Sequence, residues 1–418
     1  MGVRIGTVLL ASIVAFTPLR VTRDSPWFVG VDGPSDYREI SAFSLYSRWL
    51  QGQHEHVRAW ARRAAAHGVS SVRVILTLDG PYWVAQPREW FGHGLASGPH
   101  VPGFQEQLVP FVRAMAAEGL RVRAVLLGDL HMFVAESHWP RLQARADVLD
   151  QQSRARVREY VRQVVTTLAN EPGVIWEVAN EYANIGLGES DPFVVELGEL
   201  VKSLDPDALM NYSAPRDGRT LVTQWMQAPA DFVSVHVSRD RGDHGYRWLH
   251  DTVDVAARTS AHAVRMPLLS GEPLNFGDAR RDGRQGDVEP SPAVAFAYGA
   301  ASRLVRFSTN FHHDDGLWTA GWGGATERTL AAWKQGLDAV PMLATSPLSV
   351  SDAASPWKAD VIGPGGPVFL AANGAYSLAA GVPLGWDHAA ALKPARRMHV
   401  VARVGDGRTE AIVFREER

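Results

Sequence analysis

Short apolar segments alternate with amphipathic segments along most of this chain, and no other feature restricts the fold so strongly. Apolar or β-branched runs, which are typical of buried strands, lie at 27–31, 70–78, 121–127, 174–179, 208–212, 232–237, 266–270 and 308–311. Segments whose apolar residues recur at helical spacing lie at 54–66, 105–118, 153–170, 193–204, 248–263, 293–305 and 330–343. Strands that alternate with helices in this way form a parallel sheet covered by helices.

Eight such strands predict an α/β protein that forms a closed (β/α)8 TIM barrel, a fold that typically takes about 250 residues before loop insertions. An open, doubly wound sheet is the alternative. Its nucleotide-binding form needs a glycine-rich phosphate loop, but Gly-x-Gly-x-x-Gly does not follow the first strand and Gly-x-x-x-x-Gly-Lys does not occur. The closed barrel is therefore the predicted fold.

The sequence divides into three parts. Residues 21–345 hold the predicted barrel, and residues 346–418 are predicted to form a small β-rich unit, because short alternating runs there are separated by Gly-Pro-Gly-Gly, Asn-Gly and Asp-Gly turns. Residues 1–20 contain an apolar run, 5–16, that fits either a signal peptide or a strand under the barrel floor. The signal peptide would imply a secreted or periplasmic protein, and the run is too short to span a bilayer.

Composition excludes several classes of function. The net charge of −3 gives no basic field for nucleic acid or an anionic membrane, so neither is expected as a partner. Cysteine is absent, which excludes a thiolate metal site and a cysteine nucleophile. The 14 tryptophans suit large cores, and they also suit a cleft in which sugar rings stack on aromatic faces. The sequence leaves the oligomeric state open.

Two of the predicted strands end in a carboxylate. The run 174–179 is followed by Asn180 and Glu181, and the run 266–270 is followed by Gly271 and Glu272. An unpaired carboxylate in an apolar core costs several kcal/mol, so these side chains are expected at the rim of the sheet. Because the carboxyl ends of all barrel strands meet over one mouth, Glu181 and Glu272 are predicted to face one another there.

Two carboxylates across one cleft are the minimum for cleavage of a glycosidic bond. One gives a proton to the leaving oxygen, and the other, ionised, attacks or stabilises the anomeric carbon. Asn180 is placed to hydrogen-bond the sugar 2-hydroxyl. The further candidates within or at the ends of strands are Arg73, His131, His236 and Trp318.

The motifs Trp-Glu-Val-Ala-Asn-Glu at 176–181 and Ser-Gly-Glu-Pro at 270–273 resemble those of clan A retaining glycoside hydrolases, family 5 cellulase-like enzymes in particular. The resemblance covers about residues 20 to 345. It implies that Glu181 is the acid/base and Glu272 the nucleophile of a retaining enzyme acting on a β-linked glycan. It also implies that the carbohydrate is bound by Arg73, His131, Asn180, His236 and Trp318.

The sequence departs from that family at two positions. Tyr182 replaces the frequent proline after Asn-Glu, and Ser238 replaces the tyrosine that usually touches the nucleophile. A barrel that binds carbohydrate without cleaving it is therefore the alternative function. Structural roles are the alternative for the single residues: an ion pair for Arg73, and packing for the histidines and Trp318.

No metal or cofactor is expected. The acidic and histidine residues at 312–315 and at 240, 243 and 244 lack the spacing of known metal motifs. A Gly-x-Ser-x-Gly elbow is also missing, which argues against an esterase of the α/β-hydrolase type.

Overall fold

The computed structural model describes most of the predicted barrel and part of the chain that follows. The described residues are 16, 18–22, 25–78, 96–140, 149–182, 185, 187, 192–213, 229–236, 266–275, 295–296, 298–299, 302–303, 307–312, 324–339, 342, 359–361, 368–372, 375–380, 398–405 and 410–416. Of residues 272–275, 312, 324–326, 339 and those after 342, only the backbone is described.

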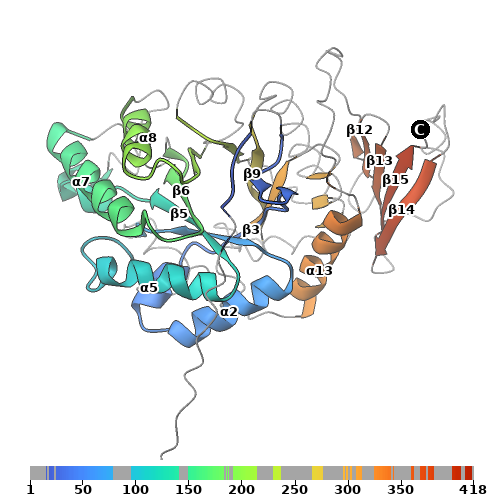
Figure 1. Ribbon diagram of the computed structural model, residues 1–418, viewed down its shortest axis with the longest axis horizontal. Coiled ribbons are helices and arrows are strands. Elements are labelled where there is room, and N and C mark those ends of the chain that lie inside the picture. The colour runs from blue at the N-terminus through green and yellow to red at the C-terminus, as the bar shows by residue number, and fades with distance from the viewer. Residues whose placement is uncertain are drawn as a thin grey trace, which may run out of the picture.

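Eight strands form one parallel sheet that curls into a nearly closed barrel (Figure 1). They are β3 (Arg38–Ser41), β4 (Ser71–Ile75), β5 (Arg121–Leu127), β6 (Val174–Ala179), β7 (Met210–Asn211), β8 (Val233–Val235), β9 (Leu268–Asn275) and β10 (Ser308–His312). Their order is β7-β6-β5-β4-β3-β10-β9-β8, and a parallel bridge between Ser213 and Ser234 joins the two outer strands. The predicted (β/α)8 barrel is confirmed.

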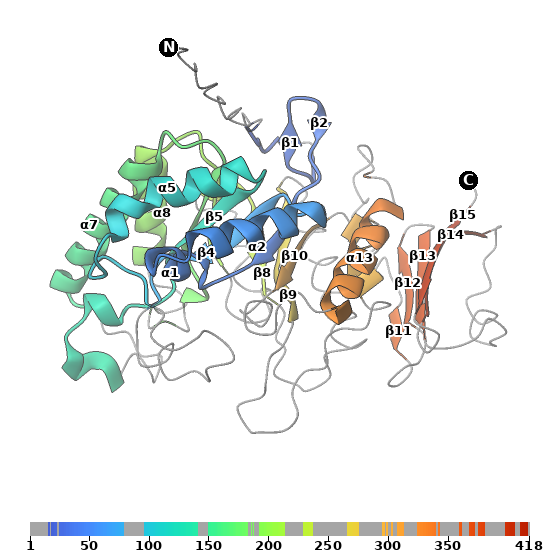
Figure 2. The same cartoon turned by 90° about the horizontal axis from the view of Figure 1, so that it is seen from below.

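Helices cover the outside of this barrel (Figures 1 and 2). They include α1 (Leu45–Leu50), α2 (His54–Ala66), α5 (Phe104–Ala117), α7 (Gln151–Leu168), α8 (Pro192–Leu204) and α13 (Gly324–Ala339). Two 3-10 turns, η1 (His131–Phe133) and η2 (Glu136–His138), follow β5. The short α1 was not expected from the sequence, and α13 begins and ends earlier than the predicted 330–343. The helix predicted at 248–263 lies outside the described residues.

The prediction of the first barrel strand is wrong. Residues 29–30 form β1 (Val29–Gly30), which pairs antiparallel with β2 (Gly33–Pro34) in a hairpin before the barrel. The first barrel strand is β3, whose sequence Arg-Glu-Ile-Ser has none of the apolar pattern of a buried strand. Its charges are tolerated because both are paired: Arg38 with Asp36, and Glu39 with Arg123 of β5.

The barrel has an apolar wall and a polar interior. Outward-facing residues of its strands, such as Val72, Val122 and Trp176, pack in the main core with the surrounding helices. Inside, a small apolar cluster that includes Tyr37 and Ile175 forms one layer. Charged side chains lie above it, where (β/α)8 barrels usually carry branched apolar residues.

Residues before the barrel contact its amino-terminal end. Leu19 packs in the same apolar cluster as Ile175, and the guanidinium of Arg121 lies over the ring of Phe16. Residues 1–15 are outside the described part, so both interpretations of the amino-terminal run remain predictions. Among the described residues, no helix has the length and apolar character needed to cross a membrane.

A second sheet follows the barrel in the chain. It has five antiparallel strands in the order β11-β12-β13-β15-β14, and β14 contacts helix α13 (Figures 1 and 2). The strands are β11 (Ala359–Val361), β12 (Val368–Ala372), β13 (Ala375–Ala380), β14 (Met398–Gly405) and β15 (Glu410–Glu416). Strand β13 was not expected from the sequence. The division of the chain at residue 345 stays a prediction.

Candidate active site

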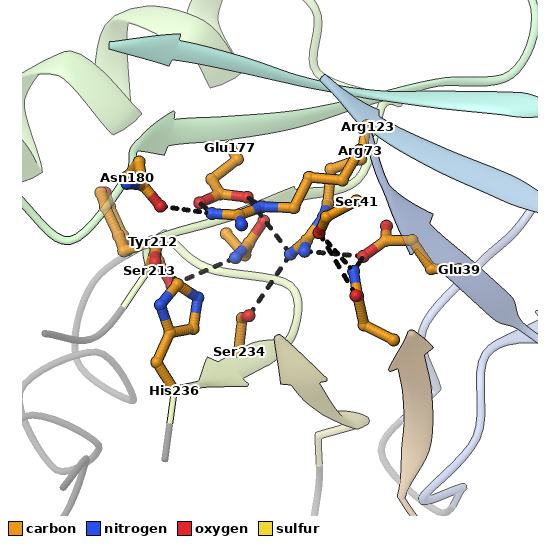
Figure 3. Close-up of polar contacts among 12 residues, drawn as sticks. Glu39, Ser41, Arg73, Arg123, Glu177, Asn180, Tyr212, Ser213, Ser234 and His236 are labelled. Atoms are coloured by element: carbon orange, nitrogen blue, oxygen red, sulfur yellow. Dashed lines mark hydrogen bonds and ion pairs between the residues drawn. The ribbon is translucent and has the colours of Figure 1, made fainter. Parts of the chain in front are cut away.

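Two buried arginines lie side by side inside the barrel (Figure 3). Arg73 of β4 and Arg123 of β5 are register partners, and neither side chain is exposed. Arg73 holds Glu177 of β6 with two hydrogen bonds, Nε to Oε2 at 2.7 Å and Nη2 to Oε1 at 2.6 Å. Such a paired contact fixes the plane of the carboxylate as well as its position. The predicted alternative for Arg73, an ion pair, is therefore present.

Arg123 extends this network to β3, which is two strands away in the sheet. Its Nη2 donates to Oε1 of Glu39 at 2.7 Å, and its Nη1 lies 3.3 Å from Oε2 of Glu177. Glu39 also accepts hydrogen bonds from Tyr37, at 2.6 Å, and from the amide of Asn310. Burial and the neighbouring Glu39 charge raise the pKa of Tyr37 well above its usual range, so its hydroxyl remains a donor. Two cations and two anions thus neutralise one another inside the barrel.

Glu177 is ionised although it is fully buried. Burial by itself would raise the pKa of its carboxyl, but the charges of Arg73 and Arg123 and the Arg73 hydrogen bonds outweigh that effect and lower the pKa below its ordinary value. A carboxylate that is held ionised and has no exposed surface cannot protonate a leaving group. Glu177 is therefore a structural partner of the arginines, although it lies only four positions before Glu181.

The network continues to Asn180 at the end of β6. Nη2 of Arg73 donates to Oδ1 of Asn180 at 2.7 Å. A guanidinium can only donate, so the amide oxygen must face it and the amide nitrogen is turned to the other side. Two of the predicted site residues, Arg73 and Asn180, are thereby brought together.

Glu181 and His236, two further predicted residues, are also in contact. Nδ1 of His236 lies 3.1 Å from Oε1 of Glu181. Its Nε2 lies 2.9 Å from Oγ of Ser213, and these two residues are labelled in Figure 3. His236 is buried, whereas the side chain of Glu181 keeps 25% of its surface exposed. In contrast to Glu177, the Glu181 side chain therefore keeps surface that a ligand can contact.

Gly271 brings β9 against the same histidine. A Cβ at this position would lie 2.4 Å from Oγ of Ser234 and 2.7 Å from ring atoms of His236. Only glycine allows so close an approach. The backbone of Glu272 follows directly in β9, and its side chain is outside the described residues. The role of Glu272 and its distance from Glu181 therefore stay predictions.

His131 lies in the turn η1 after β5. Asp129 accepts its backbone N–H at 2.7 Å and also contacts its Nδ1. The edge of Trp139 packs against the ring. Nε2 is buried and has no hydrogen-bond partner within the described part of the chain. A buried polar atom in this position is suited to form a hydrogen bond with a ligand.

The remaining predicted residues are not described. Trp318 lies in the undescribed stretch 313–323, and the polar clusters around 240 and 313 also fall outside the described residues. In the part of the chain that is described, no group of three or more histidine and acidic side chains is close enough to hold a metal ion.

Sequence reasoning overlooked three residues that support the site: Glu177, Arg123 and Ser213. Glu177 and Arg123 could have been recognised in the sequence, since a charge in the middle of a buried strand needs a partner of opposite charge. Two arginines and a glutamate on three consecutive strands could have been paired on that ground. Ser213 carried no such signal, because its role depends on the bridge that closes the barrel.

Comparisons with known proteins bear on the fold. No protein-family model matches the chain, and no curated protein matches its sequence. A solved structure described as a glycoside hydrolase has a TM-score of 0.57 at 14% identity, covering 96% of this chain and 97% of its own. A glycoside hydrolase family 5 structure from Bacteroides vulgatus has a TM-score of 0.55 at 11% identity, covering 96% and 94%.

A third solved structure is a family 5 mannosidase from Rhizomucor miehei, with a TM-score of 0.51 at 14% identity, covering 71% of this chain and 86% of its own. At these identities the likeness establishes the fold. The chain has the (β/α)8 barrel fold of glycoside hydrolase family 5 structures, as the resemblance of its motifs implied.

Proposed function

We propose that this chain is a retaining glycoside hydrolase that cleaves O-glycosidic bonds of a β-linked glycan or glycoside. The observation that carries the proposal is the position of Glu181: a partly exposed side chain at the carboxyl end of a barrel strand, with its carboxyl held by His236. The backbone of Gly271 packs against the same histidine, so Glu272 follows from β9 at the same end of the barrel. Double displacement requires two carboxylates, and we assign these roles to Glu181 and Glu272.

In the first step, a carboxylate oxygen of Glu272 attacks the anomeric carbon. The glycosidic C–O bond breaks, and the leaving oxygen takes the proton of Glu181, which gives a glycosyl ester on Glu272. In the second step, Glu181 takes a proton from water, and the water oxygen attacks the anomeric carbon. The ester bond breaks, Glu272 returns as a carboxylate, and the sugar leaves with its original anomeric configuration.

Asn180 is proposed to bind the sugar 2-hydroxyl. Because its amide oxygen accepts from Arg73, its amide nitrogen is left to donate to the sugar. The contact strengthens as charge develops at the anomeric carbon, so it stabilises the transition state more than the substrate. Arg73 acts through Asn180 and Glu177 rather than on the sugar.

The test uses aryl β-glycosides of glucose, mannose, galactose and glucuronic acid; mannose is included because one structure of this fold is described as a mannosidase. The wild-type protein is expected to release the aryl alcohol from at least one of them, with the β-anomer formed first. Glu272→Ala is expected to lose this activity and to regain part of it in azide, with a glycosyl azide of inverted configuration as product.

Glu196→Ala is the matched control, since Glu196 is a carboxylate exposed on α8 and paired with Arg158. It should keep the wild-type rate. A Glu272→Ala protein as fast as the wild type would sink the proposal. Binding of the glycosides without release of the alcohol would favour the alternative, a barrel that only binds carbohydrate.

A further inference from the structure

One buried hydroxyl, that of Ser213, contacts the backbone of Glu181 and also the histidine that holds the Glu181 carboxyl. Its Oγ accepts the backbone N–H of Glu181 at 3.3 Å and lies 2.9 Å from Nε2 of His236. The other nitrogen of that histidine lies 3.1 Å from the Glu181 carboxyl. The three side chains therefore form a closed ring, which begins at the main chain of Glu181 and returns to its carboxyl. Neither Ser213 nor His236 has appreciable exposed surface.

Glu181 has an unusual backbone conformation. Its φ of +39° is the only positive φ among the described residues that are not glycine. Such a conformation costs on the order of 1–3 kcal/mol and persists only where the surroundings hold it. The hydroxyl of Ser213 binds the N–H of this same residue. The serine thus helps to hold the backbone from which the Glu181 carboxyl projects.

The closed set of hydrogen bonds among Ser213, His236 and Glu181 also determines which nitrogen of the imidazole carries the hydrogen. Oγ of Ser213 already accepts the N–H of Glu181, and a buried hydroxyl hydrogen needs an acceptor of its own. Nε2 of His236 provides it, so the single hydrogen of the neutral imidazole is on Nδ1. That hydrogen is donated to Oε1 of Glu181. The acidic proton is then assigned to the other oxygen, Oε2.

We propose that Ser213 is a positioning residue for proton transfer by Glu181. Its hydroxyl holds His236 with the hydrogen on Nδ1, and His236 holds Oε1 of Glu181, so that the proton for the leaving oxygen is on Oε2. The inference rests on the proposed function of Glu181 as acid/base. It concerns a residue that no motif marks and that lies at the bridge closing the barrel.

The experiment compares leaving groups. A dinitrophenyl group leaves without a proton, whereas a phenyl group needs one, so a defect in proton donation slows only the second. Ser213→Ala is expected to keep kcat/KM for dinitrophenyl β-glycosides within about twofold and to lower it for phenyl β-glycosides about tenfold or more, since general acids contribute about 100-fold or more. The ratio of the two values cancels the concentration of folded enzyme, so partial unfolding does not disturb it.

Azide gives a second measurement. For the dinitrophenyl substrates, loss of base catalysis in the second step lowers kcat, and azide attacks the glycosyl ester without help from a base. Azide should therefore raise kcat of Ser213→Ala and leave the wild-type value unchanged. Ser213→Thr keeps the hydroxyl and is expected to restore most of the wild-type ratio between phenyl and dinitrophenyl substrates.

Ser234→Ala is the matched control. Ser234 is the bridge partner of Ser213, is equally buried, and its Oγ accepts a hydrogen bond from Nη1 of Arg123 at 3.3 Å. Its loss should affect both leaving groups by the same factor. Glu181→Ala is measured beside it and should show the full preference for dinitrophenyl substrates.

The outcomes separate two failures. If Glu181→Ala shows the preference and Ser213→Ala does not, Glu181 is the acid/base and the role of Ser213 is refuted. If Glu181→Ala does not show it, the proposed function of Glu181 fails, and the role of Ser213 fails with it.

Discussion

Nδ1 of His236 lies 3.1 Å from Oε1 of Glu181, and this contact joins the ends of two strands that are not neighbours along the chain. Glu181 follows β6, whereas His236 follows β8. The ring of His236 is in turn packed against the backbone of Gly271 in β9. The position of the carboxyl therefore depends on how closely three strands approach at one end of the barrel.

Gly271→Ala is expected to disturb this contact. The added methyl group would lie 2.7 Å from ring atoms of His236, closer than side-chain atoms pack, so the ring must move away from Glu181. A displacement of about 1 Å at a reacting group can lower the rate about 100-fold. We expect a loss of that size in kcat for an aryl β-glycoside, with a smaller change in KM.

Gly299→Ala serves as the control for this substitution. Its added methyl group would also clash, against the backbone at Trp333 in the helix layer, far along the chain from the site. We expect it to lower the melting temperature while the folded fraction keeps its kcat. Equal losses of kcat in the two variants would show that the effect of Gly271→Ala is only a loss of fold.

Arg123 and Glu39 form an ion pair with no exposed surface, so removal of one partner leaves a buried charge. Arg123→Met and Glu39→Gln are each expected to lower the free energy of unfolding by about 3–5 kcal/mol. The double variant should lose clearly less than the sum, because neither charge is then left alone. Chemical denaturation of the four proteins measures this, and additive losses would contradict the pairing.

The lowered pKa of Glu177 predicts how stability depends on pH. Burial opposes the ionised form, but Arg73 and Arg123 prevail, and the pKa in the folded protein is below its ordinary value of 4.5. The carboxyl therefore stabilises the fold above pH 4.5, and this contribution is lost as the pH falls through the folded pKa. Wild-type unfolding free energy should drop steeply there, and Glu177→Gln should show a weaker dependence. An unchanged slope in the variant would assign the acid sensitivity to other carboxyls.

The spacing of apolar residues along the sequence predicted much of the barrel, because the wall of the barrel is apolar. The run at 121–127 became β5 with the same bounds, and β4, β6 and the helix at 54–66 also agree closely with the prediction. The first strand could not be found in this way. Arg38 and Glu39 look like loop residues until their partners, Asp338 and Arg123, are brought from distant parts of the chain.

In the candidate site, too, local sequence predicted some features and tertiary contacts were needed for the others. The sequence marked Glu181 and Glu272 because each is a carboxylate at the end of an apolar run, where burial without a partner would be costly. The sequence selected Glu181 and passed over Glu177, which lies inside the same apolar run, but it gave no partner for the buried charge of Glu177. The packing supplies those partners: two arginines enclose Glu177, whereas Glu181 keeps part of its surface. The tertiary contacts thus decide which carboxyl can react.

His131 is expected to bind a hydroxyl of the sugar. Asp129 fixes its ring through the backbone N–H and Nδ1, which leaves the buried Nε2 for a ligand. Loss of one such hydrogen bond is worth about 0.5–1.5 kcal/mol, so His131→Ala should lower kcat/KM about threefold to tenfold. Glycosides lacking single hydroxyls identify the contact: the wild type should lose activity on one of them, and His131→Ala should lose little more on that same substrate. If the variant and the wild type lose the same factor on every deoxy substrate, His131 does not contact the sugar.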